Sequence, residues 1–365
     1  MKTLRLTVDP GHLQSPEALH ALNRAAAILR GGGLVALPTE TVYGLGAHAL
    51  DPAAVARIFA AKERPAWDPV IVHIASLSML QRLVTEVSEP AGLLMKAFWP
   101  GPLTLLLPRS AEVPDAVTAG RPLVGVRMPS HPVALALIRR AGVPIAAPSA
   151  NLFGHVSPTT AAHVLEDLDG RIDAVLDAGP ALHGVESTVL DVSQIPMRIY
   201  RPGAITEDQI NDQIRAVAGP VELYREHAEL DSTPAQPLPA PGVGLRHYSP
   251  RARLVLVEAP FAELASRLAE AAQRESGAHP GVMLPAEFGA PESIPAARIF
   301  PWGRWSAPEE MAESLYAGLR ALDACGCDVI LCPLPPAEGV GAAMRDRLRK
   351  AARGEGRGNR DTGTR

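Results

Sequence analysis

Short apolar blocks separated by polar turns recur along this chain, and they predict strands alternating with amphipathic helices. Apolar residues follow helical spacing over 15–30, where Ser15 can cap the helix and Pro16 suits its first turn. A strand over 34–38 follows, and Asp51-Pro52 opens the next helix, which reaches Lys62. Further runs predict helices at 131–141 and 158–168 and strands at 70–74, 103–107, 123–127, 143–148, 173–177, 187–192 and 197–201.

This pattern mixes strand–helix alternation with consecutive strands, which predicts an α/β fold with a mixed sheet over residues 1–217. Residues 218–250 are rich in proline and lack periodicity, as expected of a linker that can lie across the first domain. Residues 251–352 predict a smaller, Rossmann-like α/β domain, and the tail 353–365 is expected to be disordered. The smaller domain rests on strands at 253–258, 281–285 and 328–333 and helices at 261–274 and 308–322.

Composition narrows the possible functions. A chain of 365 residues, 47% of them hydrophobic, is long enough for two domains with buried cores. Its formal net charge of -4 is evenly spread and only 4% of its residues are aromatic, which argues against stable binding of nucleic acid. A site for an anion must therefore be local.

The lack of long apolar runs predicts an intracellular location. Residues 1–11 lack the apolar stretch of a signal peptide, and no run is long enough to span a bilayer, so we expect a cytoplasmic protein. Cys325, Cys327 and Cys332 have no nearby histidines to complete a zinc set, so we expect reduced thiols and no metal site built by the protein.

Lysine is rare here, with Lys2, Lys62, Lys96 and Lys350 among 35 basic residues. Lys62 closes a predicted helix two residues before Arg64, so two cations stand where a polyanion such as a triphosphate can bind. The alternative is that Lys62 only interacts favourably with the end of its helix.

Two polar turns are further candidates. Ser149-Ala150-Asn151 ends an apolar strand, and α/β proteins commonly bind ligands at such strand ends. An ordinary Asx or Ser turn would use the same residues. The segment 39–46 can wrap an anion with backbone N–H groups and hydroxyls, or it can be an ordinary glycine turn.

Four polar residues emerge from apolar strands. Arg127 and Arg201 carry the planar fork that binds carboxylate or phosphate, although each can instead form a structural ion pair. His73 can be a ligand contact or a satisfied core histidine, and Ser187 a ligand contact or a strand-edge hydroxyl. Together these residues offer positive charge and hydrogen bonds without an evident nucleophile, which suits nucleotidyl transfer.

These segments resemble the threonylcarbamoyl-AMP synthases of the YrdC-like family, in their long two-domain form. The resemblance extends from about residue 15 to residue 333. It rests on the ordered motifs Pro38–Leu45, Lys62–Pro65, Trp99–Thr104, Val126–Pro129, Pro148–Asn151, Ser157–Thr159, Glu186–Val189, Arg201–Gly203 and His247–Pro250. It implies a YrdC-like domain with a twisted mixed sheet and flanking helices.

The resemblance also implies a reaction and a set of roles. ATP, L-threonine and bicarbonate would give threonylcarbamoyl-AMP and pyrophosphate, with Mg²⁺ carried by the ATP phosphates, and downstream tRNA-modification enzymes would use the product. Roles at the reacting centre fall to Lys62, Arg64, Ser149 and Asn151. Threonine binding falls to Thr41, His73, Arg127, Ala147 and Ser187, with Arg127 taking the carboxylate. Nucleotide binding falls to Arg64, Thr118, Ser149, Ser157, Arg201 and Tyr248, with the linker as a lid.

One residue departs from the family pattern, since many relatives have Asn where Asp68 stands. A carboxylate there would repel phosphate, so Asp68 is left out of the nucleotide site unless magnesium bridges it. Two other functions stay open: a noncatalytic RNA-binding module, and a carbamoyltransferase that uses the same fold. The second would add zinc-finger and acylphosphatase-like segments, which this sequence lacks.

Overall fold

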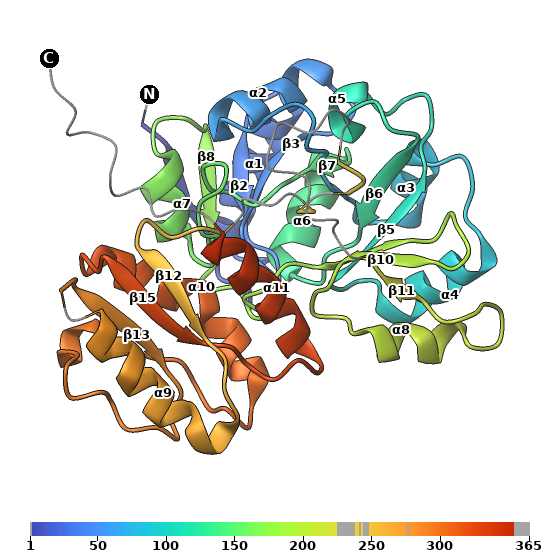
Figure 1. Ribbon diagram of the computed structural model, residues 1–365. Helices are drawn as coiled ribbons and strands as arrows, with labels where there is room; N and C mark the ends of the chain where they lie inside the picture. The colour runs from blue at the N-terminus through green and yellow to red at the C-terminus, as the bar shows by residue number, and fades with distance from the viewer. Residues whose placement is uncertain (1, 225–237, 241, 244–247, 276, 354–365) are drawn as a thin grey trace, which may run out of the picture. The chain divides into compact units, whose positions relative to one another are not determined.

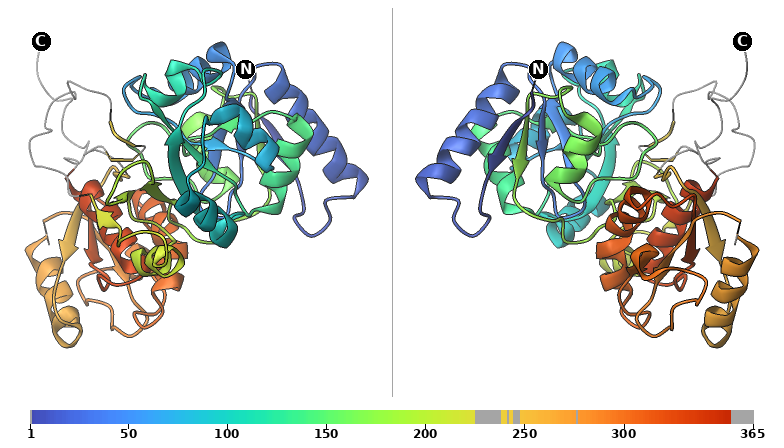
Figure 2. Two further views of the ribbon diagram at one scale, coloured as in Figure 1. Left: turned by 90° about the vertical axis from the view of Figure 1, so that its right-hand side faces the viewer. Right: turned by 90° about the vertical axis from the view of Figure 1, so that its left-hand side faces the viewer.

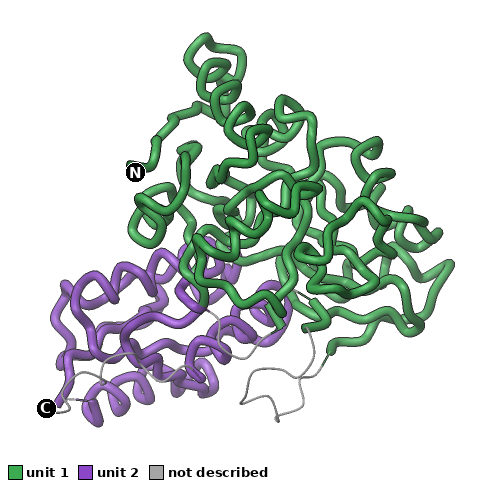
Figure 3. The backbone as a smooth tube through the Cα atoms, turned by 90° about the horizontal axis from the view of Figure 1, so that it is seen from above, with its two compact units in different colours: residues 1–153, 157–244 green, residues 154–156, 245–365 purple. Residues whose placement is uncertain are grey.

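The computed structural model describes residues 2–224, 238–240, 242–243, 248–275 and 277–353. The chain forms two compact units, which Figure 3 colours separately. Unit 1 contains residues 1–153 and 157–244, and unit 2 contains residues 154–156 and 245–365. Of the predicted tail, 353–365, only Arg353 is among the described residues. Most of the predicted linker also lies outside them.

Unit 1 is built on a mixed sheet, which confirms the predicted fold class (Figure 1). Within the described residues the strand order is β1-β8-β2-β3-β7-β4-β6-β5-β9-β10-β11. Strand β2 is parallel to β8 and antiparallel to β3, and β4 is parallel to β6 and antiparallel to β7. The strands are β1 (Leu4–Thr7), β2 (Val35–Leu37), β3 (Gly44–His48), β4 (Val72–His73), β5 (Leu103–Pro108), β6 (Leu123–Arg127), β7 (Ile145–Ala146), β8 (Ala174–Asp177), β9 (Thr188–Asp191), β10 (Arg198–Arg201) and β11 (Glu222–Leu223).

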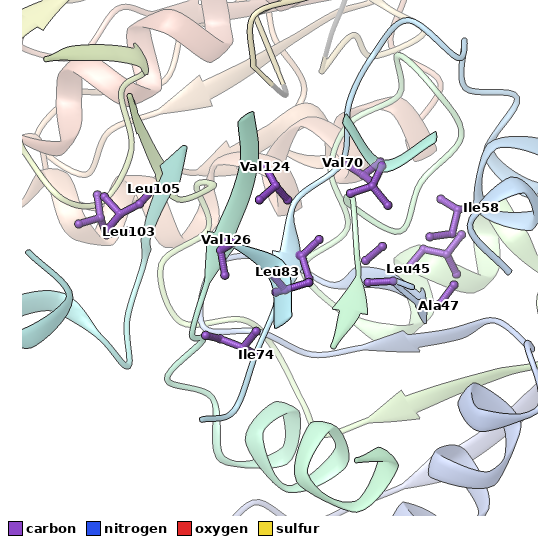
Figure 4. Packing of buried hydrophobic residues seen from close by; sticks show 14 of the residues in the cluster. Leu45, Ala47, Ile58, Val70, Ile74, Leu83, Leu103, Leu105, Val124 and Val126 are labelled. Carbon is purple, nitrogen blue, oxygen red and sulfur yellow. The ribbon is translucent and has the colours of Figure 1, made fainter. Parts of the chain in front are cut away.

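Helices cover both faces of this sheet because successive strand residues point to opposite faces. Val35 and Leu37 belong to the apolar cluster that α1 and α6 cover, whereas Leu34 and Ala36 belong to the cluster on the other face. Figure 2 shows α1, in dark blue, on an outer side of unit 1, and Figure 4 shows the second cluster from close by. The helices are α1 (Pro16–Arg30), α2 (Pro52–Lys62), α3 (Leu77–Leu83), α4 (Glu89–Phe98), α5 (Asp115–Thr118), α6 (Pro132–Ala141), α7 (Ala161–Leu168) and α8 (Glu207–Ile214).

The two best-marked helices begin as their sequences predict. The Ser15 hydroxyl accepts a hydrogen bond from the Ala18 N–H at the start of α1. The Asp51 carboxylate accepts one from the Ala53 N–H at the start of α2, with Pro52 in the first turn. These side chains satisfy N–H groups that have no partner within the helix, so each start is fixed locally.

Unit 2 contains a parallel four-stranded sheet in the order β12-β15-β13-β14, which confirms the predicted small α/β domain. Helix α9 packs on one face through Leu264 and Leu268. Helix α10 approaches β13 so closely that a Cβ on Gly318 would lie 2.5 Å from Met283 Sδ, which explains a glycine inside a helix. The elements are β12 (Arg253–Val257), α9 (Phe261–Arg274), β13 (Pro280–Leu284), a 3₁₀ turn (Ala296–Arg298), β14 (Ile299–Pro301), α10 (Pro308–Ala324), β15 (Val329–Pro333) and α11 (Val340–Ala352).

Residues 218–224, 238–240 and 242–243 of the predicted linker belong to unit 1, whereas its last residues, 248–250, belong to unit 2. Strand β11 lies within the range 218–250 and pairs with β10. Farther along, the Leu238 N–H donates to the Trp67 carbonyl at 3.1 Å. Ala240 and Val243 are buried in a small cluster with Ile71, Leu106 and Val189. This part of the chain therefore covers apolar surface of the sheet.

Candidate active site

The end of α2 fixes the directions of Lys62 and Arg64. Glu63 adopts a left-handed conformation, with φ of 54°. Its N–H donates to the Ala60 carbonyl, and the Arg64 N–H donates to the Phe59 carbonyl. This is the Schellman arrangement, which reverses the chain within one residue. The two cations are thus held on either side of a tight helix end.

Lys62 is buried and holds the predicted Ser149–Asn151 turn. Its Nζ donates to the Ser149 carbonyl at 2.6 Å and to the Asn151 carbonyl at 2.5 Å. Burial and, secondly, the nearby Arg64 charge place the pKa of Lys62 well below its ordinary value, although Asp68 acts in the opposite direction. Lys62 contacts the backbone of the turn, so its ammonium organises the peptide from which the Ser149 and Asn151 side chains project.

Arg64 is paired with Asp68. Arg64 Nη2 lies 2.9 Å from Asp68 Oδ1, and the two side chains are only 6% and 0% exposed. The guanidinium also donates to the backbone carbonyls of Asp68 and Pro69, at 3.1 Å and 2.7 Å. Burial raises the pKa of the Asp68 carboxyl, and the charges of Arg64, Lys62 and Arg201 oppose that rise. Asp68 therefore lies within the field of all three cations.

Arg201 reaches Ser187. Its Nε and Nη2 donate to the Ser187 carbonyl at 3.1 Å and 3.0 Å, and Nη2 also donates to the Ser187 hydroxyl at 3.1 Å. The Ser187 hydroxyl lies 2.8 Å from that of Thr104. Gly203 allows this approach, because a Cβ there would lie 2.3 Å from the Thr188 nitrogen. These three Arg201 contacts are hydrogen bonds to one predicted site residue.

Arg127 forms the buried ion pair that the sequence left open. Its Nη2 lies 2.6 Å from Glu40 Oε1, its Nη1 donates to the Thr41 hydroxyl at 3.0 Å, and its Nε donates to the Gly101 carbonyl at 3.2 Å. Burial acts to raise the pKa of Glu40, but the charge and hydrogen bond of Arg127 and backbone N–H groups outweigh it, so the pKa lies below its ordinary value. These contacts use three of the five guanidinium N–H groups, which leaves donors for a substrate carboxylate.

Two histidines accompany this pair. His73 lies beside Arg127 in the β4–β6 ladder, and His131 precedes α6. Within the described part of the chain, Nδ1 of each is buried without a hydrogen-bond partner. Burial, and then the Arg127 charge, lower the pKa of His73 to about 3, and burial lowers that of His131. Both rings are therefore neutral at pH 7 and can offer a hydrogen bond without charge.

Backbone pairing joins the two groups of residues. The Ala150 N–H donates to the Tyr43 carbonyl at 2.8 Å, and Ser149 forms a β-bridge with Gly44. Ala147, predicted to contact threonine, follows β7 and donates its N–H to the Ile71 carbonyl at 2.9 Å. The 39–46 turn, which carries Glu40 and Thr41, thus runs beside the turn that Lys62 holds. Within the former turn the Thr39 hydroxyl accepts from the Thr41 and Val42 N–H groups, so part of its hydrogen bonding is local.

The remaining predicted residues have different surroundings. Thr118 ends α5, and the N–H of Val70, two residues after Asp68, donates to the carbonyl of the neighbouring Val117. The Ser157 hydroxyl donates to Glu186 Oε1 at 2.6 Å, with both residues buried. Tyr248 belongs to unit 2. There its ring stacks on that of Tyr316, with centroids 5.8 Å apart, and Arg347 lies 5.3 Å from the ring centroid.

Several polar residues of this region were not predicted to have roles. They are Glu40, Thr104, His131 and Glu186. Glu40, Thr104 and Glu186 lie inside motifs that carry the family resemblance, so their positions in the sequence could have indicated a role. Their partners, however, are 29 to 87 residues away in the sequence and become visible only in the folded sheet, as in the Arg127–Glu40 ion pair. His131 lies two residues after a motif and has no local signal.

The described residues lack a metal-binding cluster and a membrane-spanning helix. They contain no group of three or more His, Cys, Asp or Glu side chains that could hold a metal ion. No helix in the described part of the chain is long and apolar enough to cross a membrane.

Comparison with known proteins now adds to this geometry. Residues 27–203 match the family described as "Telomere recombination", and residues 205–353 match the family described as "Threonylcarbamoyl-AMP synthase, C-terminal domain". The threonylcarbamoyl-AMP synthase of Pyrococcus abyssi is 44% identical over 330 residues, covering 90% of this chain and 93% of that protein. The chain belongs to the threonylcarbamoyl-AMP synthase family.

Two further members span nearly the whole chain. The threonylcarbamoyl-AMP synthase of Bacillus subtilis is 45% identical over 359 residues, which cover 97% of this chain and 99% of that protein. The crystal structure of P. abyssi Sua5 complexed with L-threonine superposes with a TM-score of 0.84 at 41% identity, covering 96% of this chain and 98% of that one. The predicted family and its two-domain form are thereby confirmed.

Proposed function

We propose that this protein is an L-threonylcarbamoyladenylate synthase, which condenses L-threonine, bicarbonate and ATP to threonylcarbamoyl-AMP and pyrophosphate. The product would serve downstream enzymes that modify tRNA, and the reaction would take place in the cytoplasm. The observation that carries the proposal is the link between two groups of residues within unit 1. The charge of Arg201, like those of Arg64 and Lys62, acts to lower the pKa of Asp68. Arg201 also donates a hydrogen bond to Ser187, which is predicted to bind threonine.

Arg127 would bind the threonine carboxylate. Its guanidinium is held in place by Glu40, Thr41 and the Gly101 carbonyl, so little side-chain entropy is lost when substrate binds. His73 and His131 are neutral, and they would offer hydrogen bonds without attracting a second carboxylate. Such a site orients the amino acid while its amino group reacts with bicarbonate.

Lys62, Arg64 and Arg201 would surround the phosphates. The carbamate attacks the α-phosphate, and negative charge accumulates on the departing pyrophosphate, which fixed cations stabilise. Mg²⁺ would enter bound to the ATP phosphates as part of the substrate. Ser149 and Asn151, whose backbone Lys62 holds, would position the reacting groups. Burial of Lys62, Asn151 and Arg201 would limit hydrolysis of the labile carbamate.

Pyrophosphate release tests the proposal. With ATP, Mg²⁺ and bicarbonate, the protein should release pyrophosphate only when L-threonine is added. Arg64→Ala should abolish release, whereas Arg82→Ala, which alters an exposed ion pair with Glu112, should leave it unchanged. Release that does not depend on threonine, or that requires carbamoyl phosphate, would contradict the proposal. Tight binding of RNA without any release would support the RNA-binding alternative.

A further inference from the structure

A fully buried carboxylate lies among the cations that would bind the ATP phosphates. Asp68 is paired with Arg64 at 2.9 Å, and its side chain has no exposed surface. Lys62, at the end of α2, and Arg201, on β10, also lower its proton affinity. A site for a polyanion gains nothing from a carboxylate that repels phosphate, so the presence of Asp68 requires a separate explanation.

Asp68 is not needed to position Arg64. Two backbone carbonyls, of Asp68 and Pro69, accept hydrogen bonds from the guanidinium at 3.1 Å and 2.7 Å. The ring of Phe153 adds a third support, with its centroid 6.0 Å from Arg64 Cζ. These contacts do not depend on the charge of the carboxylate. The contribution of the Asp68 side chain is therefore mainly electrostatic.

The cations do need a counter-charge when no nucleotide is bound. Lys62, Arg64 and Arg201 are 1%, 6% and 5% exposed, and three neighbouring buried positive charges repel one another. An ionised Asp68 offsets that repulsion. When phosphates arrive they supply the same compensation, and the carboxylate then becomes a buried negative charge close to other negative charges.

We propose that Asp68 is an internal counter-anion of the phosphate site, ionised against Lys62, Arg64 and Arg201 in the free protein, and that it takes up a proton when nucleotide phosphates bind these cations. This inference rests on the proposed function, since it requires the nucleotide to bind at these residues. It makes Asp68 a positioning residue that adjusts the charge of the site and does not react.

The sign of the pH dependence follows from linkage. Burial already raises the pKa of Asp68 in the free protein, and bound phosphate raises it further. The complex then binds more protons than the free protein between these two pKa values. Nucleotide affinity should fall as pH rises through that interval, by up to about tenfold per pH unit for one proton.

Calorimetric titration tests this directly. A non-hydrolysable ATP analogue with Mg²⁺ is titrated into the full chain at about pH 6 to 8, in two buffers with different ionisation enthalpies. Asp68→Asn has nearly the same shape and carries no titratable group at this position. Its titration therefore measures the protons that the nucleotide itself exchanges, and this value is subtracted from that of the wild type. Glu112→Gln, at an exposed ion pair, is the matched control.

The wild type and Glu112→Gln should take up one more proton per nucleotide than Asp68→Asn at the lower end of that range. The variant should also bind more tightly at the upper end, by about tenfold. Equal proton uptake in wild type and variant would overturn the inference. Binding that is weaker in Asp68→Asn only when Mg²⁺ is present would also overturn it, because Asp68 would then be a magnesium contact. If Asp68→Asn does not fold, buffer-independent binding heats in the wild type would overturn it. Failure of the wild type to bind nucleotide would instead overturn the proposed function.

Discussion

Arg127 Nη2 lies 2.6 Å from Glu40 Oε1, and the two side chains are 4% and 2% exposed. This ion pair lies where the amino acid is proposed to bind, so the cation that would receive the threonine carboxylate already has a partner. The pair fixes the guanidinium before substrate arrives and prevents Arg127 from being an uncompensated buried charge.

Glu40→Gln should therefore lower both stability and threonine affinity. It leaves the Arg127 charge buried without its counter-charge, which should reduce the free energy of unfolding by about 3 kcal/mol. Glu112→Gln makes the same chemical change at an exposed ion pair with Arg82, at 2.7 Å, and should cost about 1 kcal/mol or less. Urea unfolding and threonine titration measure the two effects. Equal losses in both variants would show that the buried pair has no special role.

His73 should make stability depend on pH. Its pKa is lowered to about 3 in the folded protein, whereas in the unfolded chain it is near the ordinary 6.5. As pH falls below about 6.5 the unfolded state takes up a proton that the folded state does not, so stability falls until about pH 3, at about 1.4 kcal/mol per pH unit for one proton.

His73→Gln should reduce the slope of the free energy of unfolding against pH by the contribution of one proton, as measured by urea unfolding at a series of pH values. The exposed His20→Gln should keep the slope of the wild type. An unchanged slope in His73→Gln would mean that the buried imidazole is protonated in the folded protein, and the neutral contact proposed for threonine would then be wrong.

Lys62→Met should affect both the fold and the reaction. It removes the donor to two carbonyls of the 149–151 turn, and leaving these groups unsatisfied should cost about 2 kcal/mol or more. Pyrophosphate release should be lost as well. Lys96 also lies in the last turn of its helix, α4, but it is exposed, so Lys96→Met should have little effect on either. Full activity in Lys62→Met would remove Lys62 from the reacting centre.

Two shortened chains distinguish the stabilising effect of the segment that covers unit 1 from the effect of the predicted lid. A chain that ends at residue 217 loses β11 and the buried Ala240 and Val243, so it should be less stable than a chain that ends at 244. Both lack Tyr248, and both should turn over more slowly or release more hydrolysed intermediate. A wild-type rate in the longer of the two would reject a lid that acts through Tyr248.

Local sequence signals predicted much of the fold. Ser15, Asp51 and the proline after each set the starts of α1 and α2, because capping depends on neighbouring residues alone. Strand β3 was not predicted, since Gly44 and Gly46 indicate a turn. Only the folded sheet shows that a Cβ on Gly46 would lie 2.8 Å from Leu37 and 2.9 Å from Ile145. The short β11 was included in the linker because two residues carry no periodicity.

The candidate site was predictable in its residue types but not in its pairings. Lys62, Arg127 and Ser187 were singled out from motifs, and their roles toward ligands stay predictions. Lys62 binds carbonyls of the Ser149–Asn151 turn, and Arg127 pairs with Glu40, and both contacts join residues that are 87 to 89 positions apart in the sequence. Such contacts follow from strand order, which the sequence pattern leaves open.

The most direct test of the central claim uses ¹³C-labelled bicarbonate. Incubated with ATP, Mg²⁺ and L-threonine, the protein should form an adenylate whose mass contains one threonine, one AMP and one labelled carbon, and Arg127→Met should form none. An adenylate without the labelled carbon, or the same labelled product from Arg127→Met, would contradict a single site that joins carbamoylated threonine to the nucleotide.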